Sequence, residues 1–135
     1  MTARYFSVDE VNDLLPELSP VLGELLERRA RVVRETENDV ALFEDYRSDI
    51  GGVLPSEIAG EFIVIERLLE KVRAFGCEIK DLNGGLIDFL AKKEGGREVY
   101  LCWRYGEPPE IRYYHELHTG FGGRKEIRPS DIFVT

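Results

Sequence analysis

The chain has 135 residues, a net charge of −8 and a pI near 4.9. This length fits one domain that needs no disulfide or metal to stabilise its core, so we expect a single domain over residues 1–135. The negative charge repels a phosphate backbone and no basic stripe offsets it, so we expect no nucleic-acid partner. The sequence has no apolar run near the roughly 20 residues that cross a membrane and no secretory pattern, which predicts a cytoplasmic protein without a membrane partner.

A capping box predicts where the first helix begins. Ser7 and Glu10 stand three residues apart, so each side chain can accept a hydrogen bond from the backbone N–H of the other. Phe6 and Val11 flank this pair and are placed to pack on each other as a hydrophobic staple. We therefore expect a helix from about Val8.

Prolines are expected to interrupt this helix. Pro16 removes a backbone donor and clashes with the preceding turn, and Ser19-Pro20 resembles a cap followed by proline in a first turn. These residues predict a short first helix and then a kink or restart. A long amphipathic helix is expected from Pro20 to about Tyr46, ending before Gly51-Gly52. Its apolar stripe contains Leu22, Leu26, Ala30, Val33, Val40 and Phe43.

A second long helix is predicted from Pro55-Ser56 to Gly76, a residue suited to a left-handed C-terminal cap. The two helices should pair as an antiparallel hairpin. The first would span roughly 40 Å at about 1.5 Å per residue, which is longer than a small sheet needs. A homo-oligomer, most simply a dimer through the long helices, would cover the excess; the alternative is burial within one chain. The second stripe contains Ile58, Phe62, Ile65, Leu69 and Val72.

After Gly76 the hydrophobic period changes to two, which predicts an antiparallel β-meander of three or four strands. The fold class is therefore α+β, with a helical part at about 7–76 packed on a β part at about 77–135. The expected strands are Cys77–Lys80, Leu86–Ala91, Glu98–Arg104 and Glu110–Glu116. Alternation favours an inward face of Val99, Leu101, Trp103 and Ile111 with His115 at the edge of that core, although the strand register stays open.

His115, Glu116 and His118 form a possible metal site, because imidazole and carboxylate groups are suitable ligands for zinc. A further ligand would have to come from elsewhere, and Asp88, Glu107 and Cys102 are the candidates. With an open position for water, such a site predicts a metal-binding or metal-dependent hydrolytic protein. Apart from this divalent metal, no cofactor is expected.

The competing hypothesis is a self-associating interaction module for an unknown protein or small molecule. No serine lies in a nucleophile elbow, and Cys102 stands between two large side chains in a strand, so enzymatic activity is the less favoured interpretation and no catalytic residue is assigned. The β part would carry a polar recognition surface. Its expected members are Asp88, Arg104, Glu107, His115, Glu116 and Arg124.

The chain contains the motifs Tyr5–Pro16, Gly76–Asp81, Gly85–Phe89, Cys102–Glu107, His115-Glu116 and Gly120–Arg124. With these motifs it resembles one family, the bacterial domain of unknown function 2203. The resemblance covers nearly the whole chain but implies no activity. In that family an acidic residue often stands where this chain has His118, which favours a general polar cluster over a two-histidine metal site.

Overall fold

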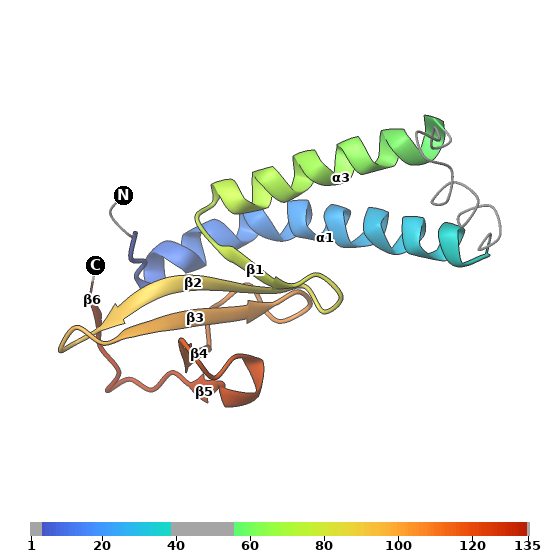
Figure 1. The fold of residues 1–135 in the computed structure, drawn as a ribbon. Helices are drawn as coiled ribbons and strands as arrows, with labels where there is room; N and C mark the ends of the chain where they lie inside the picture. The colour runs from blue at the N-terminus through green and yellow to red at the C-terminus, as the bar shows by residue number, and fades with distance from the viewer. Residues whose placement is uncertain (1–3, 39–55, 135) are drawn as a thin grey trace.

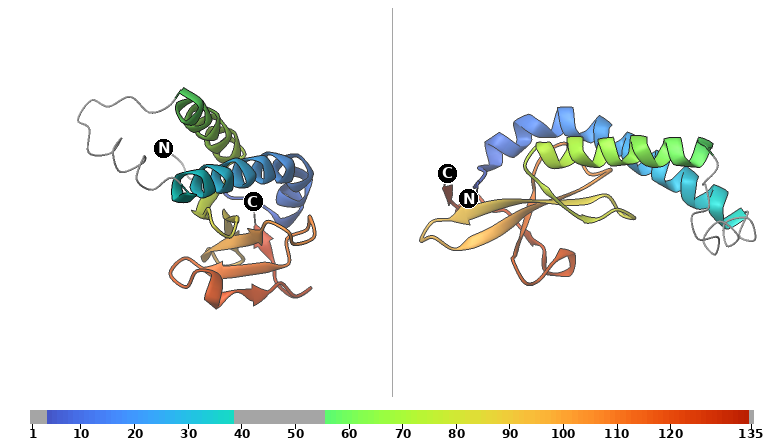
Figure 2. Two further views of the ribbon diagram at one scale, coloured as in Figure 1. Left: turned by 90° about the vertical axis from the view of Figure 1, so that its right-hand side faces the viewer. Right: turned by 45° about the horizontal axis from the view of Figure 1, so that its top comes forward.

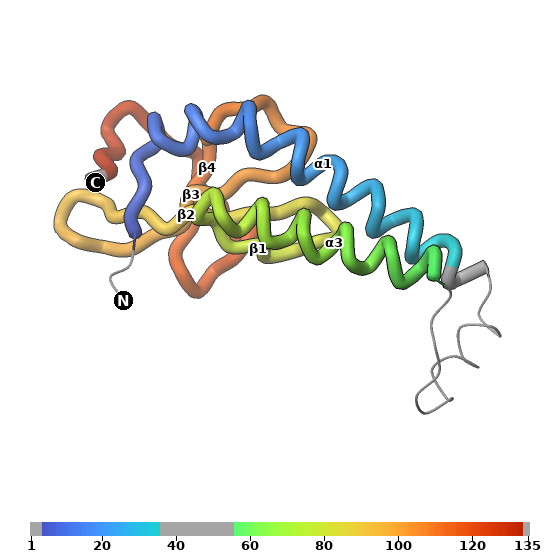
Figure 3. The backbone as a smooth tube through the Cα atoms, turned by 90° about the horizontal axis from the view of Figure 1, so that it is seen from above, coloured from blue at the N-terminus to red at the C-terminus, as the bar shows by residue number. Residues whose placement is uncertain are grey.

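Two helices lie on one face of an antiparallel sheet in the computed structural model, which describes residues 4–38 and 56–134 (Figure 1). This arrangement confirms the predicted α+β class. The helix α1 (Val8–Asn38) crosses above the sheet, and α3 (Ser56–Ala74) returns beside it in the opposite direction (Figure 3). Within the described residues, neither helix is long and apolar enough to span a membrane.

The capping box at the start of α1 is confirmed. The Ser7 N–H donates to Glu10 Oε1 and the Glu10 N–H donates to Ser7 Oγ, both at 3.1 Å. Phe6 and Val11 are fully buried on either side of the cap, as a staple requires. The cap and staple together determine where the chain enters the core.

The predicted restart at Pro20 is wrong, because α1 runs without interruption through Pro16 and Pro20. Both prolines are exposed and stand four residues apart, so they share the solvent-facing side of the helix. The helix is curved rather than broken (Figure 2). A bend towards the core tolerates missing backbone bonds on the solvent side, where water can replace them. The predicted extension of this helix to Tyr46, including Val40, Phe43 and Gly51-Gly52, lies outside the described residues.

The antiparallel hairpin is confirmed, and an ion pair of 3.0 Å between Arg28 and Glu61 joins its helices. After α3 the chain reverses at Gly76, whose φ of 100° is the predicted left-handed conformation. The expected α3 stripe needs one correction. Leu68 is buried at its centre, whereas Phe62 is 41% exposed because it lies on the edge of the packed face.

The sheet is larger than predicted, with six strands among the described residues instead of three or four. Its path runs β1-β2-β3-β4-β5, and β6 pairs with β2. The two additional strands have only two residues each, which is too short for alternation to reveal them. The strands are β1 (Glu78–Asp81), β2 (Leu86–Lys93), β3 (Glu98–Arg104), β4 (Tyr113–Glu116), β5 (Lys125–Glu126) and β6 (Phe133–Val134), with a 3-10 turn η1 at Phe121–Gly123.

The face of the sheet that packs against the helices is the one predicted. Its members are in the core at no more than 4% exposure: Val99, Leu101, Trp103 and Ile111. The prediction that His115 lies at the edge of this core is wrong. His115 pairs with Tyr100 and therefore lies on the opposite face of the sheet. Alternation does not extend from Ile111 to His115, since β4 begins only at Tyr113 and the Ile111 N–H instead donates to Asn12 Oδ1 at 2.7 Å.

Candidate functional site

Three ionisable side chains from three neighbouring strands meet on the sheet face that points away from the helices. The register pairs Asp88 of β2 with Cys102 of β3 and pairs Tyr100 of β3 with His115 of β4. Because alternate residues share a face, Asp88, Cys102 and His115 converge. Their ligand atoms all lie within 4.8 Å of one another, and each residue is only 1% exposed. We refer to these three residues as the buried cluster.

Hydrogen bonds determine how many protons the buried cluster holds. His115 Nδ1 lies 2.7 Å from the carbonyl oxygen of Glu116, which can only accept, so Nδ1 carries a proton. His115 Nε2 lies 2.9 Å from Asp88 Oδ2. One shared proton must lie between these two atoms, because two lone pairs would repel each other. The other carboxylate oxygen, Asp88 Oδ1, is buried and has no hydrogen-bond partner among the described residues.

Burial dominates the acid–base properties of the buried cluster. It raises the pKa of Asp88 above its ordinary value, and the positive charge of His115 opposes the shift. Burial, together with the negative charge of Asp88, raises the pKa of the Cys102 thiol far above its ordinary value. The second buried thiol, Cys77, has its pKa raised to about 12, also mainly by burial. Neither thiol would be an ionised nucleophile at neutral pH.

A second charged group borders the buried cluster. Arg124 Nη2 donates to both carboxylate oxygens of Glu107, at 2.8 and 2.9 Å, and Glu107 Oε1 also accepts the backbone N–H of Arg104 at 2.6 Å. The Arg124 guanidinium lies 4.1 Å from the ring centre of Tyr113 and 4.7 Å from that of Phe121. These contacts hold η1 and the loop before β5 against the outer face of the sheet.

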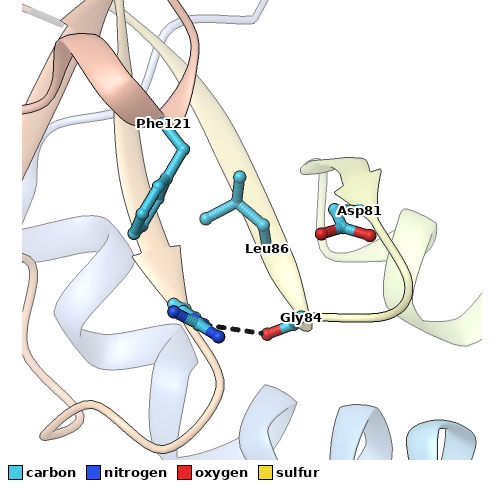
Figure 4. A pocket seen from close by; sticks show the side chains of 5 residues that line it. Asp81, Gly84, Leu86 and Phe121 are labelled. Carbon is cyan, nitrogen blue, oxygen red and sulfur yellow. Dashed lines mark hydrogen bonds between the residues drawn. The ribbon is translucent and has the colours of Figure 1, made fainter.

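A small pocket of about 160 Å³ opens near the turn between β1 and β2 (Figure 4). Arg104 forms one side, where its Nε donates to the carbonyl oxygen of Gly84 at 3.4 Å, and Asp81 also lines the pocket beside Gly84. Leu86 and the exposed ring of Phe121 complete the lining. The pocket therefore presents a cation, an anion and an aromatic surface to solvent.

The structure separates the residues that were predicted to bind metal together. His118 is exposed in the turn after β4, and the Glu116 carboxylate pairs with Arg97 at 3.4 Å and with Lys125 at 3.5 Å. His115 meets Asp88 and Cys102 instead, two of the three residues considered as a remote ligand. Glu107, the third, belongs to the ion pair with Arg124.

The predicted recognition residues fall into two groups. Asp88 and His115 are buried. Arg104 is exposed with Glu107 and Arg124 partly buried near it, and Glu116 is partly buried beside Arg97 and Lys125. Sequence reasoning missed Asp81 as a pocket residue. It follows an irregularity in the pairing of β1 with β2, so strand alternation did not indicate where its side chain would lie.

The sequence was also compared with protein families, curated proteins and solved structures. A family model described as "Uncharacterized conserved protein (DUF2203)" matches residues 4–127. The chain belongs to this family. The match includes both helices, the strands β1 to β5 and all three residues of the buried cluster. No curated protein and no solved structure matches the chain. Membership of DUF2203 thus supports the bounds of the domain. It assigns no activity to this protein.

Proposed function

We propose that this DUF2203 protein is a small interaction module that forms a dimer through its helical hairpin. The observation that carries the proposal is the position of Ile63, which is 53% exposed on α3. Exposed side chains on helices are usually polar, and adjoining large apolar residues there favour a docking surface. Phe62, also exposed, extends this apolar area.

Ile63 lies at the centre of the solvent-facing side of α3. At 3.6 residues per turn it lies opposite the buried Leu68 and Val72, and its exposed neighbours one turn away are Gly60, Glu66 and Arg67. A Cβ atom added at Gly60 would have open space around it, so the helix backbone is accessible at that point. This side of α3 would accept a second helix at short distance.

A second copy of the same helix is the occupant that the charges favour. The first turn of α3 contains Glu57 and its last turn contains Lys71 and Arg73. In a two-fold symmetric pair of antiparallel α3 helices, the acidic end of one faces the basic end of the other. Ile63 lies near the middle of α3 and would meet its equivalent close to the symmetry axis.

The oligomeric state tests this proposal directly. Light scattering after size-exclusion chromatography, over a concentration series, should give a dimer for the wild type and a monomer for Ile63→Lys. Ile132→Lys is the matched control, because Ile132 is 50% exposed but lies outside the hairpin. It should remain a dimer. A wild-type monomer at the highest concentration, or equal dissociation of both variants, would refute the α3 interface.

The pocket between Asp81 and Arg104 is the recognition surface that we propose for a further partner. A donor and an acceptor in the same lining favour a primary or backbone amide, which can accept from Arg104 and donate to Asp81. The exposed Phe121 ring supplies the adjoining apolar contact. Titration with N-acetyl-glutamine amide should shift the NMR resonances of the pocket residues. These shifts should disappear in Arg104→Gln, and persistence there would contradict the assignment.

The alternative function, a metal-dependent hydrolase, receives less support from this geometry. Hydrolysis requires an open metal position that substrate and water can reach. The buried cluster is closed, with each residue 1% exposed, and the exposed His118 lies away from it. A metal held by the buried cluster would therefore stabilise the sheet instead of acting on a substrate.

A further inference from the structure

We infer that Asp88, Cys102 and His115 form a structural binding site for a divalent transition metal of the zinc class. The three side chains supply a carboxylate, a thiol and an imidazole from three adjacent strands, with ligand atoms within 4.8 Å of one another. All three are 1% exposed. The site is independent of the proposed dimer, since it lies on the opposite side of the sheet from the helices.

The second observation that points to a ligand is the unpartnered oxygen of Asp88. Buried carboxylate oxygens almost always accept a hydrogen bond, and each exception requires an explanation. Asp88 Oδ1 has no such partner of ordinary hydrogen-bond geometry in the described part of the chain, although the Cys102 thiol interacts with the Asp88 carboxylate group. A cation beside Asp88 would satisfy this oxygen, either by bidentate binding or through a bound water.

The spacing of the ligand atoms is close to what a tetrahedral ion needs. Bonds of about 2.0–2.3 Å place the ligands of a tetrahedral zinc roughly 3.3–3.8 Å apart. In the structure, His115 Nε2 and Asp88 Oδ2 are 2.9 Å apart, and the largest separation within the cluster is no more than 4.8 Å. Side-chain movements of about 1 Å or less would bring the three atoms into the metal geometry.

The histidine already has the hydrogen bond that a metal ligand needs. Histidines that bind metals usually donate the second ring N–H to a carboxylate or carbonyl oxygen, which orients the free lone pair. The His115 Nδ1–H makes this bond to the carbonyl oxygen of Glu116 at 2.7 Å. Nε2 is consequently the nitrogen directed into the cluster.

Charge balance favours a divalent ion. A neutral imidazole, an Asp88 carboxylate and a Cys102 thiolate carry a combined charge of −2, which one divalent cation neutralises inside the protein. Without metal, the same neutrality requires the proton shared by His115 and Asp88 and the proton on the Cys102 thiol. Binding would therefore displace about two protons for each metal ion. The thiolate selects a zinc-class ion over magnesium or calcium, which prefer oxygen ligands.

The test begins with the metal content of the full-length protein, expressed with zinc in the medium and dialysed. Elemental mass spectrometry should give near-stoichiometric metal for the wild type and for Cys77→Ser. Cys77 is the matched control because it is also a buried cysteine but its Sγ donates to the carbonyl oxygen of Val72 on the helix side of the sheet. Cys102→Ser and Asp88→Asn should each lose most of the metal.

Cobalt provides a readout that does not depend on retention during purification. Protein refolded with Co²⁺ should show thiolate-to-cobalt charge-transfer absorption, which is lost in Cys102→Ser and kept in Cys77→Ser. Calorimetry in buffers of different ionisation enthalpy should give about two protons released for each ion. Asp88→Asn, which preserves side-chain shape, keeps the test informative if Cys102→Ser fails to fold. Metal-free wild type without cobalt absorption, or absorption that disappears only in Cys77→Ser, would overturn the site.

Discussion

Asp88 Oδ2 lies 2.9 Å from His115 Nε2 in the interior of the protein, although the two residues are 27 positions apart in the sequence. The pair lies across three strands, because Asp88 belongs to β2 and His115 to β4. Cys102 of β3 lies between them in the sheet. Asp88 and His115 are ionisable residues, which are rarely buried. Because each satisfies the buried polar group of the other, the pair should have a large effect on stability.

The first prediction concerns this pair. His115→Ala leaves the Asp88 carboxylate buried without its partner, and breaking a buried pair in this way typically costs about 3–5 kcal/mol of unfolding free energy. Urea denaturation measures the change. His118→Ala is the control, since an exposed histidine should change the unfolding free energy by no more than about 0.5 kcal/mol. Equal effects of the two substitutions would show that the buried pair is energetically unimportant.

The second prediction concerns alkaline stability. Burial raises the pKa of Cys77 from 9.0 to about 12, so above pH 9 the unfolded chain loses this proton while the folded chain retains it. A raised folded-state pKa means that stability falls as pH rises, by at most about 1.4 kcal/mol per pH unit for one thiol. In denaturation curves between pH 9 and 11, Cys77→Ala should lose stability less steeply than the wild type. Parallel slopes would contradict the prediction.

The third prediction concerns the turn after α3. Gly76 has a φ of 100°, and a Cβ atom there would lie 2.5 Å from Phe6 Cζ. Gly76→Ala therefore combines a left-handed backbone conformation, which costs about 1–2 kcal/mol, with a steric clash against the core. Gly95→Ala separates the two effects, because Gly95 has a φ of 96° and open space around it. Thermal unfolding should show a greater loss for Gly76→Ala, and equal losses would exclude the steric contribution.

The fourth prediction concerns the cation that holds the loop before β5. Arg124→Lys retains the charge but loses the planar group that stacks on Tyr113 and bonds both oxygens of Glu107. We expect a loss of about 1–2 kcal/mol of unfolding free energy, from the hydrogen bond to a charged group and the stacking. Arg112→Lys, at a side chain that is 53% exposed, should be nearly neutral in the same urea titration. A neutral Arg124→Lys would show that charge alone suffices.

Much of the fold was predictable because its determinants are local in sequence. The capping box of Ser7 and Glu10 requires only residues three positions apart, and it appears as expected. Gly76 ends the helical part for an equally local reason, its left-handed backbone. The prolines show the limit of this reasoning. Pro16 and Pro20 oppose a helix locally, yet packing of the buried face of α1, with Leu15 and Leu18, outweighs them.

The candidate site was only partly predictable because its residues depend on register. Local sequence patterns were enough to identify the side chains that carry chemistry and to place Val99, Leu101 and Trp103 on one face. The folded sheet was needed to show that Asp88 pairs with Cys102, and that the strand containing His115 begins at Tyr113. A shift of one residue in either pairing would have sent these side chains to opposite faces of the sheet. Local patterns cannot encode that choice, because it results from how strands distant in sequence pack against the same two helices.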